Sequence, residues 1–500
     1  MFKVVLAALL LLMSRSPIWA EEDAAAIYKE HCAECHGADR LGLMGPALLP
    51  QNLKRLRRKN AHRVIANGRI ATQMEGFGAR LSSDQIDALV EMIYTKLPYV
   101  PKWGKEEIEA SRTIAAEVDK WITRPIYDAD PLNLFVVVES GDHHVTILNG
   151  DTFEPIHRFE SRFALHGGPK FTPDGRYVFF ASRDGWITKF DLYTLEVLAE
   201  VRAGINTRNM AISSDGASLA VANYLPHTLV LLNADDLSVD KIFDVRDKKG
   251  ESSRVSAVYQ ARPRKSFIAA LKDVGEAWEI STDVAKANTE KGMFSLRRID
   301  TGEPLDDFFF NQAYSRMLGS SRDGKSARVL DLDTGKMITS IALPGLPHMG
   351  SGITFTYKGR RVMATPHLRE NRISIIDMDT WKVIKTIKTK GPGFFMRSHE
   401  NTPYAWAGVF FGPNRDLVHI IDKRSLEIVK TLKPVPGKTA AHVEFDRDGT
   451  HALLSIWDMD GAIIVYDAKT FKEVKRLKMV KPAGKYNVHN KITFSEGTSH

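Results

Sequence analysis

The chain has 500 residues, 43% hydrophobic and 26% charged, and this length is too great for one compact core. Its formal net charge of +8 favours attraction of acidic partners, and the absence of a basic stripe interleaved with aromatic residues argues against a nucleic-acid-binding protein. Both cysteines lie in one short motif, so a disulfide framework is excluded.

The first 20 residues are predicted to be a signal peptide. Lys3 supplies a positive charge, residues 4–13 are apolar, and Ala20 ends a short polar stretch before an acidic run. The apolar stretch is too short for a membrane span, and no later stretch approaches the roughly 20 apolar residues that a membrane helix needs. We therefore expect export to the periplasm, as a soluble protein without membrane insertion.

A cysteine motif marks the next segment, residues 21–97. In Cys32-Ala33-Glu34-Cys35-His36, two thiols three positions apart can form thioethers to one haem, and His36 can then face the iron. A redox dithiol leaves His36 unexplained, and a zinc site lacks its second pair of ligands. The motif therefore predicts one covalent haem c with His36 as its proximal iron ligand.

The rest of this segment is similar to class I cytochromes c, which are all-α domains. Residues 45–48 (GPAL) resemble the turn that braces the proximal histidine, and residues 71–78 (ATQMEGFG) resemble the loop that presents the sixth iron ligand. The resemblance implies Met74 as that ligand, and a thioether suits electron transfer because it raises the haem potential relative to a second imidazole. His62 is the competing ligand, although a helix-surface position also explains it. Apolar residues at helical spacing predict a closing helix over residues 82–96.

Residues 98–131 are predicted to link this domain to a second one. From residue 98 to residue 125 the segment contains three prolines, Pro98, Pro101 and Pro125, and it has a charged stretch of helical character around residues 105–120.

Residues 132–500 contain an internal repeat. In each copy a short strand ends in Asp, Asn or Ser, and a Thr, Ser or Asp with a bulky residue usually follows shortly after. The copies begin 42 to 50 residues apart, at Asn149, Asp191, Asn233, Ser281, Asp331, Asp377, Asp422 and Asp467. Several copies also carry an Asp-Gly hairpin turn, as at Asp174 and Asp448. Four short strands per repeat and eight repeats predict an all-β, eight-bladed β-propeller, and the lack of helical spacing excludes an α/β alternation.

This domain order and five strings of residues resemble cytochrome cd1 nitrite reductase and its relatives, and among them most closely the dihydro-haem d1 dehydrogenases. The strings are residues 163–168 (FALHGG), 346–352 (LPHMGSG), 394–401 (FFMRSHEN), 441–445 (AHVEF) and 484–491 (GKYNVHNK). The resemblance implies that the propeller binds haem d1 noncovalently in its central channel.

Single residues take expected roles from this resemblance. His166 matches the proximal ligand of haem d1, and His348 matches a distal histidine that ligates iron or contacts the substrate. The nitrite reductases have a second distal histidine, which residues 306–312 (DDFFFNQ) lack, and this argues against nitrite reduction. His442 and Tyr486 match positions of acid–base chemistry, His442 as the base and Tyr486 as a proton relay or a positioning group.

The implied reaction oxidises a propionate side chain of dihydro-haem d1 to an acrylate and passes the electrons through haem c to an external acceptor. The substrate is rich in carboxylates, so Arg183, Arg208 and Arg397 are candidates to bind it, with surface salt bridges as the alternative. Nitrite reductase or another haem d1 maturation protein is the expected recipient of the product. The alternative functions are a cd1-type nitrite reductase, a non-catalytic haem d1 carrier and an electron-transfer cytochrome without haem d1.

Overall fold

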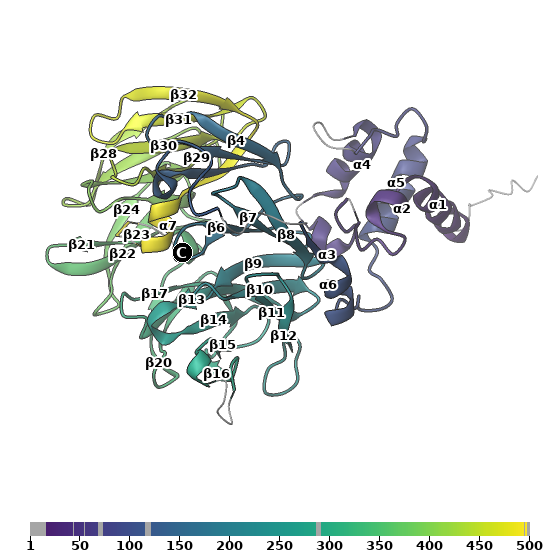
Figure 1. Ribbon diagram of the computed structural model, residues 1–500, viewed down its shortest axis with the longest axis horizontal. Coiled ribbons are helices and arrows are strands. Elements are labelled where there is room, and N and C mark those ends of the chain that lie inside the picture. The colour runs from purple at the N-terminus through teal and green to yellow at the C-terminus, as the bar shows by residue number, and fades with distance from the viewer. Residues whose placement is uncertain are drawn as a thin grey trace, which may run out of the picture. The chain divides into compact units, whose positions relative to one another are not determined.

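The computed structural model describes residues 17–43, 45–54, 56–68, 74–115, 122–286, 292–494 and 496–497. The chain divides into two compact units, Met1–Val100 and Pro101–His500. Figure 1 shows helices in the first unit and strands through most of the second. Residues 1–16 of the predicted signal peptide lie outside the described part. Among the described residues, no helix is long and apolar enough to cross a membrane.

The first unit is built from short helices around one apolar core. They are α1 (Pro17–His31), α2 (Ala33–His36), α3 (Pro50–Leu53), α4 (Arg58–Asn67) and α5 (Ser83–Tyr94). Helix α5 begins at a capping box, because the Ser82 hydroxyl accepts from the Gln85 amide and the Gln85 side chain accepts from the Ser82 amide. Its apolar face packs against α1, as the spacing of apolar residues over 82–96 predicts.

The predicted linker is less helical than its charge pattern suggests. Helix α6 (Lys105–Ser111) packs against β8 and β12 of the second unit, and residues 116–120 lie outside the described part. The helix ends early because the β-branched Thr113 and Ile114 form strand β1 (Thr113–Ile114), which pairs with β8. The expected helix around residues 105–120 is therefore wrong over residues 112–115, and its part from residue 116 to residue 120 lies outside the described residues.

Among the described residues, the second unit forms eight antiparallel sheets, which confirms the predicted propeller. One sheet joins the chain's last strand to its first blade: β2 (Phe135–Glu139), β3 (His144–Leu148), β4 (Pro155–Glu160) and β33 (Pro482–Asn487). The next blades are β5 (Lys170–Phe171), β6 (Tyr177–Ala181), β7 (Trp186–Asp191) and β8 (Glu196–Arg202), then β9 (Asn206–Ile212), β10 (Ser218–Leu225), β11 (Thr228–Asn233) and β12 (Val239–Asp244), then β13 (Val255–Ala261), β14 (Ser266–Leu271), β15 (Glu276–Ser281) and β16 (Leu296–Asp300).

Four further blades complete the ring. They are β17 (Leu305–Phe310), β18 (Arg316–Ser321), β19 (Ser326–Asp331) and β20 (Lys336–Ala342), then β21 (Ile353–Tyr357), β22 (Arg360–Pro366), β23 (Arg372–Asp377) and β24 (Val383–Lys388), then β25 (Gly393–Arg397), β26 (Tyr404–Val409), β27 (Val418–Asp422) and β28 (Glu427–Leu432), then β29 (Ala440–Phe445), β30 (His451–Ile456), β31 (Gly461–Asp467) and β32 (Glu473–Met479). Short helices are η1 (Pro131–Asn133), η2 (Arg262–Arg264), η3 (Val284–Lys286), η4 (Met349–Ser351) and α7 (Val488–Thr493).

The repeated motif is the turn between the third and fourth strands of a blade. In the copy at Asp377, the carboxylate accepts from the amides of Asp379 and Thr380, and the backbone carbonyl accepts from the amide of Trp381. Trp381 has a φ of 56°, in the left-handed region, and the copies at Asp191 and Asp467 close in the same way. The acidic residue therefore stabilises a strained turn, which explains why the turn recurs as a recognisable sequence motif.

The inner strands of the eight blades, each at one edge of its sheet, are β33, β5, β9, β13, β17, β21, β25 and β29. These strands contact one another from blade to blade, as β9 does β13 and β29 does both β25 and β33. The ring closes where β33 pairs with β2, with Val136 opposite Tyr486. Apolar clusters between neighbouring blades form the core and hold the inner strands in place.

Candidate functional site

The haem c attachment residues lie together in the first unit. Cys32 and Cys35 are half-buried free thiols, Cys32 as the N-cap of α2 and Cys35 within the helix. The Nδ1 of His36 is 2.8 Å from the carbonyl oxygen of Pro46, so Nδ1 donates and Nε2 carries the lone pair that iron needs. A Cβ on Gly45 would lie 2.7 Å from the ring of His36, so glycine at this position lets the turn of residues 45–48 approach the ring. These residues fit a covalent haem with His36 as ligand.

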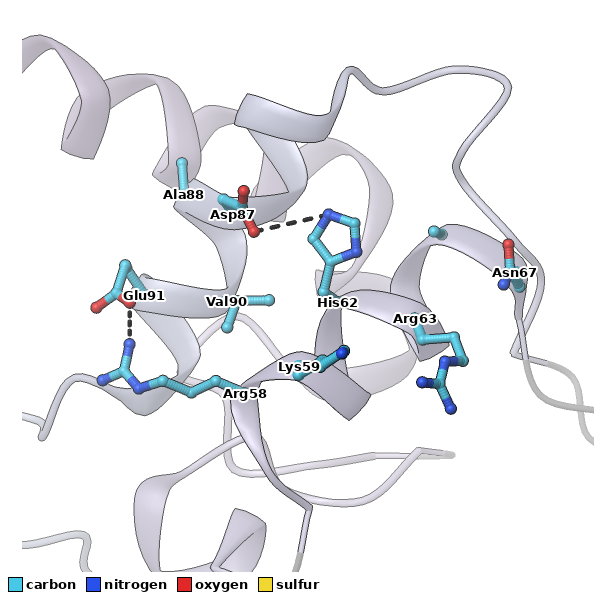
Figure 2. Close-up of a pocket in the computed structure, with 10 residues that line it drawn as sticks. Arg58, Lys59, His62, Arg63, Asn67, Asp87, Ala88, Val90 and Glu91 are labelled. Carbon is cyan, nitrogen blue, oxygen red and sulfur yellow. Dashed lines mark hydrogen bonds and ion pairs between the residues drawn. The ribbon is translucent and has the colours of Figure 1, made fainter.

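The two candidates for the sixth ligand lie in different surroundings. Met74 is half-buried and packs against the core with other partly buried apolar side chains, although residues 71–73 of its loop lie outside the described part. His62 lines a groove of about 790 Å³ between α4 and α5, where its Nε2 is 3.6 Å from a carboxylate oxygen of Asp87 (Figure 2). Figure 2 also shows Arg58 paired with Glu91 across the groove. Met74 stays the predicted ligand.

In the second unit, His166 precedes β5 and is held by two arginines. Its Nδ1 is 2.9 Å from the carbonyl oxygen of Arg208, so Nδ1 donates and Nε2 carries the lone pair. That Nε2 accepts from Arg183 Nη2 at 2.7 Å. The guanidinium of Arg183 therefore lies where an iron ligated by His166 would be.

His348 lies on the loop before η4 and is held in the same way. Its Nδ1 is 3.0 Å from the carbonyl oxygen of Phe394, whose ring packs against it at 4.2 Å, so the lone pair again lies on Nε2. Burial lowers the pKa of His348, opposed by the negative charge of Asp307. Asp307 accepts from the Tyr259 hydroxyl and the Gly350 amide, both at 2.8 Å, and so fixes the loop.

Arg208, on β9, is half-buried near the phenols of Tyr224 and Tyr259 and the carboxylates of Asp306 and Asp307. Burial alone would lower its pKa, but Tyr224 and Asp307 outweigh this and raise it. Arg397, on β25, is 5% exposed, and its Nε lies 3.4 Å from a carboxylate oxygen of Glu444. Arg397 is thus buried, which argues against a surface salt bridge for it, whereas Arg208 is half-buried on an inner strand.

His442 and Tyr486 meet on the neighbouring inner strands β29 and β33. Their ring centroids are 5.0 Å apart with the planes at 69°, and Phe395 lies 4.9 Å from His442. Two glycines cradle the phenol: a Cβ on Gly484 would lie 2.6 Å from the Tyr486 oxygen, and one on Gly168 3.2 Å from its ring. Since Gly168 belongs to the His166 loop, the pair lies beside the predicted proximal ligand.

The protonation states of this pair are set by burial and by nearby cations. The pKa of His442 lies well below its ordinary value because of burial and then the charges of Lys485, Arg397 and Lys491. Burial raises the pKa of Tyr486 to about 12. Near neutral pH the imidazole is therefore uncharged and the phenol is protonated.

Three lysines of this site were missed by sequence reasoning. Lys485 is fully buried beside Tyr486. Burial and then Arg397 lower the pKa of Lys170, on β5, to about 8. Lys491, on α7, lies 5.8 Å from the centre of the Tyr486 ring. A lysine within a strand pattern is ordinarily solvent-exposed, so only the position of Lys485 and Lys491 inside the string at 484–491 could have pointed to them.

Comparisons with known proteins agree with this geometry. Residues 129–491 match the Cytochrome D1 heme domain family, and residues 20–93 match the family of cytochrome c oxidase, cbb3-type, subunit III. The chain is 55% identical over 480 residues to dihydro-heme d1 dehydrogenase of Pseudomonas aeruginosa, which covers 96% of both chains. It is 24% identical to nitrite reductase of Stutzerimonas stutzeri, over 94% of this chain and 93% of that one.

A solved structure gives the same relationship. The structure described as dihydro-heme d1 dehydrogenase NirN in complex with DHE superposes with a TM-score of 0.90 at 54% identity, over 94% of this chain and all of that one. The predicted relationship and the predicted fold class are both confirmed. With a haem c motif in the first unit and two histidines and a His–Tyr pair around the axis of the second, this chain belongs to the dihydro-haem d1 dehydrogenase family.

Proposed function

We propose that this chain is an oxidoreductase of haem d1 biosynthesis that converts one propionate side chain of dihydro-haem d1 to an acrylate. The observation that carries the proposal is the contact between His442 and Tyr486 beside the loop of His166. This contact would place two groups beside a bound macrocycle, where its propionates would lie. Both groups can transfer protons. The name of the 55% identical relative supports the same reaction.

The described residues fit this substrate. His166 and His348 each carry the ring lone pair on Nε2, the state in which a histidine ligates iron. Arg183 must leave His166 when the substrate binds, and its guanidinium then becomes available to a carboxylate. Buried Arg397 and half-buried Arg208 and Lys170 add positive charge for the other carboxylates.

The reaction removes two protons and two electrons from a CH2–CH2 unit. We propose that His442 and Tyr486 carry its acid–base chemistry, His442 as a neutral imidazole and Tyr486 as a protonated phenol that holds the side chain or relays a proton. Haem c, held by Cys32, Cys35, His36 and Met74, would supply a one-electron carrier towards an external acceptor.

The cellular setting is part of the proposal. The signal-peptide pattern of the first 20 residues supports a periplasmic location. Nitrite reductase or another haem d1 maturation protein is proposed to receive the product, because a noncovalent product must leave the propeller before it can serve as a cofactor.

Nitrite reduction is the weaker alternative. It needs protons delivered to a bound oxygen by a pair of distal histidines, and residues 306–312 contain none. The side chain of Asp307 in this stretch is already engaged by Tyr259 and Gly350.

The test is to mix the full chain anaerobically with dihydro-haem d1 and measure the mass of the product. Loss of two hydrogens establishes the dehydrogenase, and unchanged substrate that stays bound favours the carrier. His166→Ala should weaken uptake or change the spectrum of the bound haem, because it removes an iron ligand. His442→Ala should keep uptake and lose conversion by roughly 100-fold or more.

A further inference from the structure

Positive charge is concentrated on one side of the propeller. Each blade has an outer strand, and the segment formed by this strand and three residues on either side differs in charge between blades. The net charge is 0, −1, −2, 0 and 0 at β4, β8, β12, β16 and β20, and +4, +2 and +4 at β24, β28 and β32. We refer to the last three segments, residues 380–391, 424–435 and 470–482, as the basic belt. Together they carry +10, more than the +8 of the whole chain.

The lysines of the belt lack the acidic partners that outer strands have elsewhere. On β16, Arg297 donates to a carboxylate oxygen of Glu279 at 2.9 Å. On β4, Arg158 donates to a carboxylate oxygen of Glu139, also at 2.9 Å. Within the described part of the chain, five exposed lysines of the belt have no side-chain hydrogen bond, ion pair or ring contact: Lys382, Lys388, Lys390, Lys472 and Lys478. Like charges on one surface repel one another, so the fold gains no stability from this arrangement.

The belt is continuous across its three blades. Lys385, on β24, lies 3.8 Å from a carboxylate oxygen of Glu427, at the start of β28. Lys430, on β28, lies 5.3 Å from the centre of the Phe471 ring, in the turn before β32. Exposed apolar side chains lie among the lysines: Val383, Ile384, Val429 and Val474. Apolar side chains surrounded by charged ones are typical of surfaces that bind other proteins.

A groove at one end of the belt is suited to a carboxylate. It has a volume of about 520 Å³ and lies between strand β24 and the turn that joins β22 to β23. Arg369, from the turn, and Lys388, from β24, line it, and neither side chain has a hydrogen bond or ion pair among the described residues. Glu370, the acidic residue of the groove, is already paired with Arg372. The groove therefore offers two cations that no acidic residue neutralises.

Protection of strand edges does not account for the belt. Lysine on an outer strand discourages pairing with another chain, so some lysines are expected there. But β12 and β20 are outer strands of the same kind, and their segments carry −2 and 0.

The shape and composition of the belt favour a protein over a membrane surface. In a closed ring of eight blades, neighbouring blades differ by about 45°, so β24 and β32 face directions about 90° apart. A flat bilayer would touch only a narrow arc of such a convex side. The exposed large apolar side chains of the belt are valine and isoleucine, whereas proteins that bind membrane surfaces insert Trp, Phe and Leu.

We propose that the basic belt is a docking surface for a partner protein that presents an acidic, extended segment. Carboxylates of that segment pair with the lysines of β24, β28 and β32, and one carboxylate enters the groove between Arg369 and Lys388. The belt contains no residue of the candidate functional site, so the docking surface stands apart from the proposed function. Salt weakens the attraction, because exposed charges are screened.

The test measures binding of the full chain to a poly-L-glutamate peptide of about 20 residues, which reaches up to about 70 Å when extended. The belt variant combines Lys382→Gln, Lys388→Gln, Lys472→Gln and Lys478→Gln. A control variant loses the same charge at exposed lysines outside the belt, whose side chains also have no hydrogen bond or ion pair among the described residues: Lys102→Gln, Lys105→Gln, Lys248→Gln and Lys249→Gln.

The wild type should bind the peptide, and the belt variant should bind it about 30-fold more weakly, since it loses four exposed ion pairs of ordinary strength. The control variant should stay within about 3-fold of the wild type, because its charges lie away from the bound peptide. Equal losses in the two variants would show that only net charge matters and would overturn the proposal. Absence of binding to the wild type at low salt would do the same.

Two further measurements separate a protein partner from a membrane. Vesicles of phosphatidylethanolamine and phosphatidylglycerol at about 3:1 should bind the wild type no better than the belt variant. Vesicle binding that needs the belt lysines, without peptide binding, would assign the belt to a membrane instead. Acetylation of the wild type, read by mass spectrometry, should slow at Lys388 and Lys478 when the peptide is bound and stay unchanged at Lys248. Unchanged acetylation at all three lysines would place the peptide elsewhere and refute the docking surface.

Discussion

Gly484→Ala tests whether the placement of Tyr486 matters for catalysis. Gly484 lies two residues before Tyr486 on β33, so their side chains leave the strand on the same face. A Cβ at this position would lie 2.6 Å from the phenol oxygen and 3.0 Å from two ring carbons. Gly484 does not have a left-handed φ, so alanine adds no backbone strain, and the contact with Tyr486 is the main steric effect of the change.

The size of the effect follows from the overlap. Ordinary van der Waals contact begins at 3.4 Å, so the hydroxyl must retreat by about 0.8 Å. A misplacement of 1 Å can cost about 100-fold in rate, so we expect conversion to fall by about 50-fold. The free energy of unfolding should change by no more than about 1 kcal/mol, because replacing glycine restricts the unfolded chain while the ring can move aside.

The rate of single-turnover conversion, followed by the mass of the product, checks the first value. Urea unfolding checks the change in the free energy of unfolding. In a Tyr486→Phe background the hydroxyl is already gone, so adding Gly484→Ala should slow conversion far less than about 50-fold. A Gly484→Ala chain that converts substrate at the wild-type rate would refute the reasoning, since the cradle would then be irrelevant to the reaction. Additive losses in the two backgrounds would show that the alanine acts on something other than the hydroxyl.

Three further predictions concern the haem sites. Changing both Cys32 and Cys35 to alanine should abolish the haem-stained band of the denatured protein, because each thiol supplies one thioether, and a persisting band would contradict the attachment site. Met74→His should keep haem c, lower its potential and remove the red charge-transfer band of methionine-ligated ferric haem; a wild type without that band would make His62 the ligand. Substrate uptake should weaken as pH rises through 8, because burial and Arg397 lower the pKa of Lys170 to about 8 and only its protonated form attracts carboxylates. Lys170→Met should remove this step, and an affinity that is flat across this range would contradict the assignment.

The architecture was predictable because its signals are local. The eight turns that begin with Asp, Asn or Ser mark the blades, and the first unit's haem motif occupies five consecutive residues. A capping box at Ser82 and helical spacing mark α5. The prediction failed where local signals conflict. At Thr113 and Ile114 the charge pattern favours a helix, but these residues form a strand that pairs with β8.

The site was only partly predictable, because its geometry comes from residues far apart in sequence. His442 and Tyr486 were expected to take part, but their ring contact and the cradle of Gly168 and Gly484 required the fold. The strand pattern does not indicate that Lys485 is buried, since it cannot tell a buried lysine from one in water, and only its place in the string at 484–491 marks it. The roles of the individual site residues therefore stay predictions for the experiments above.

The last strand carries two residues of the candidate site and also closes the ring. Strand β33 supplies Tyr486 and Lys485, and its pairing with β2 is what joins the end of the propeller to its beginning. The chain after β33 then contacts other blades: Arg262, in η2, donates to the carbonyl of Ile492 at 2.6 Å, and Arg361, on β22, pairs with Glu496 at 2.9 Å.

These contacts lie on blades distant in sequence from β33, so they can form only after those blades have assembled. Because Tyr486 lies on the closing strand, an incomplete propeller cannot form the proposed His442–Tyr486 pair. The same closure that stabilises the fold thus also brings Tyr486 into contact with His442.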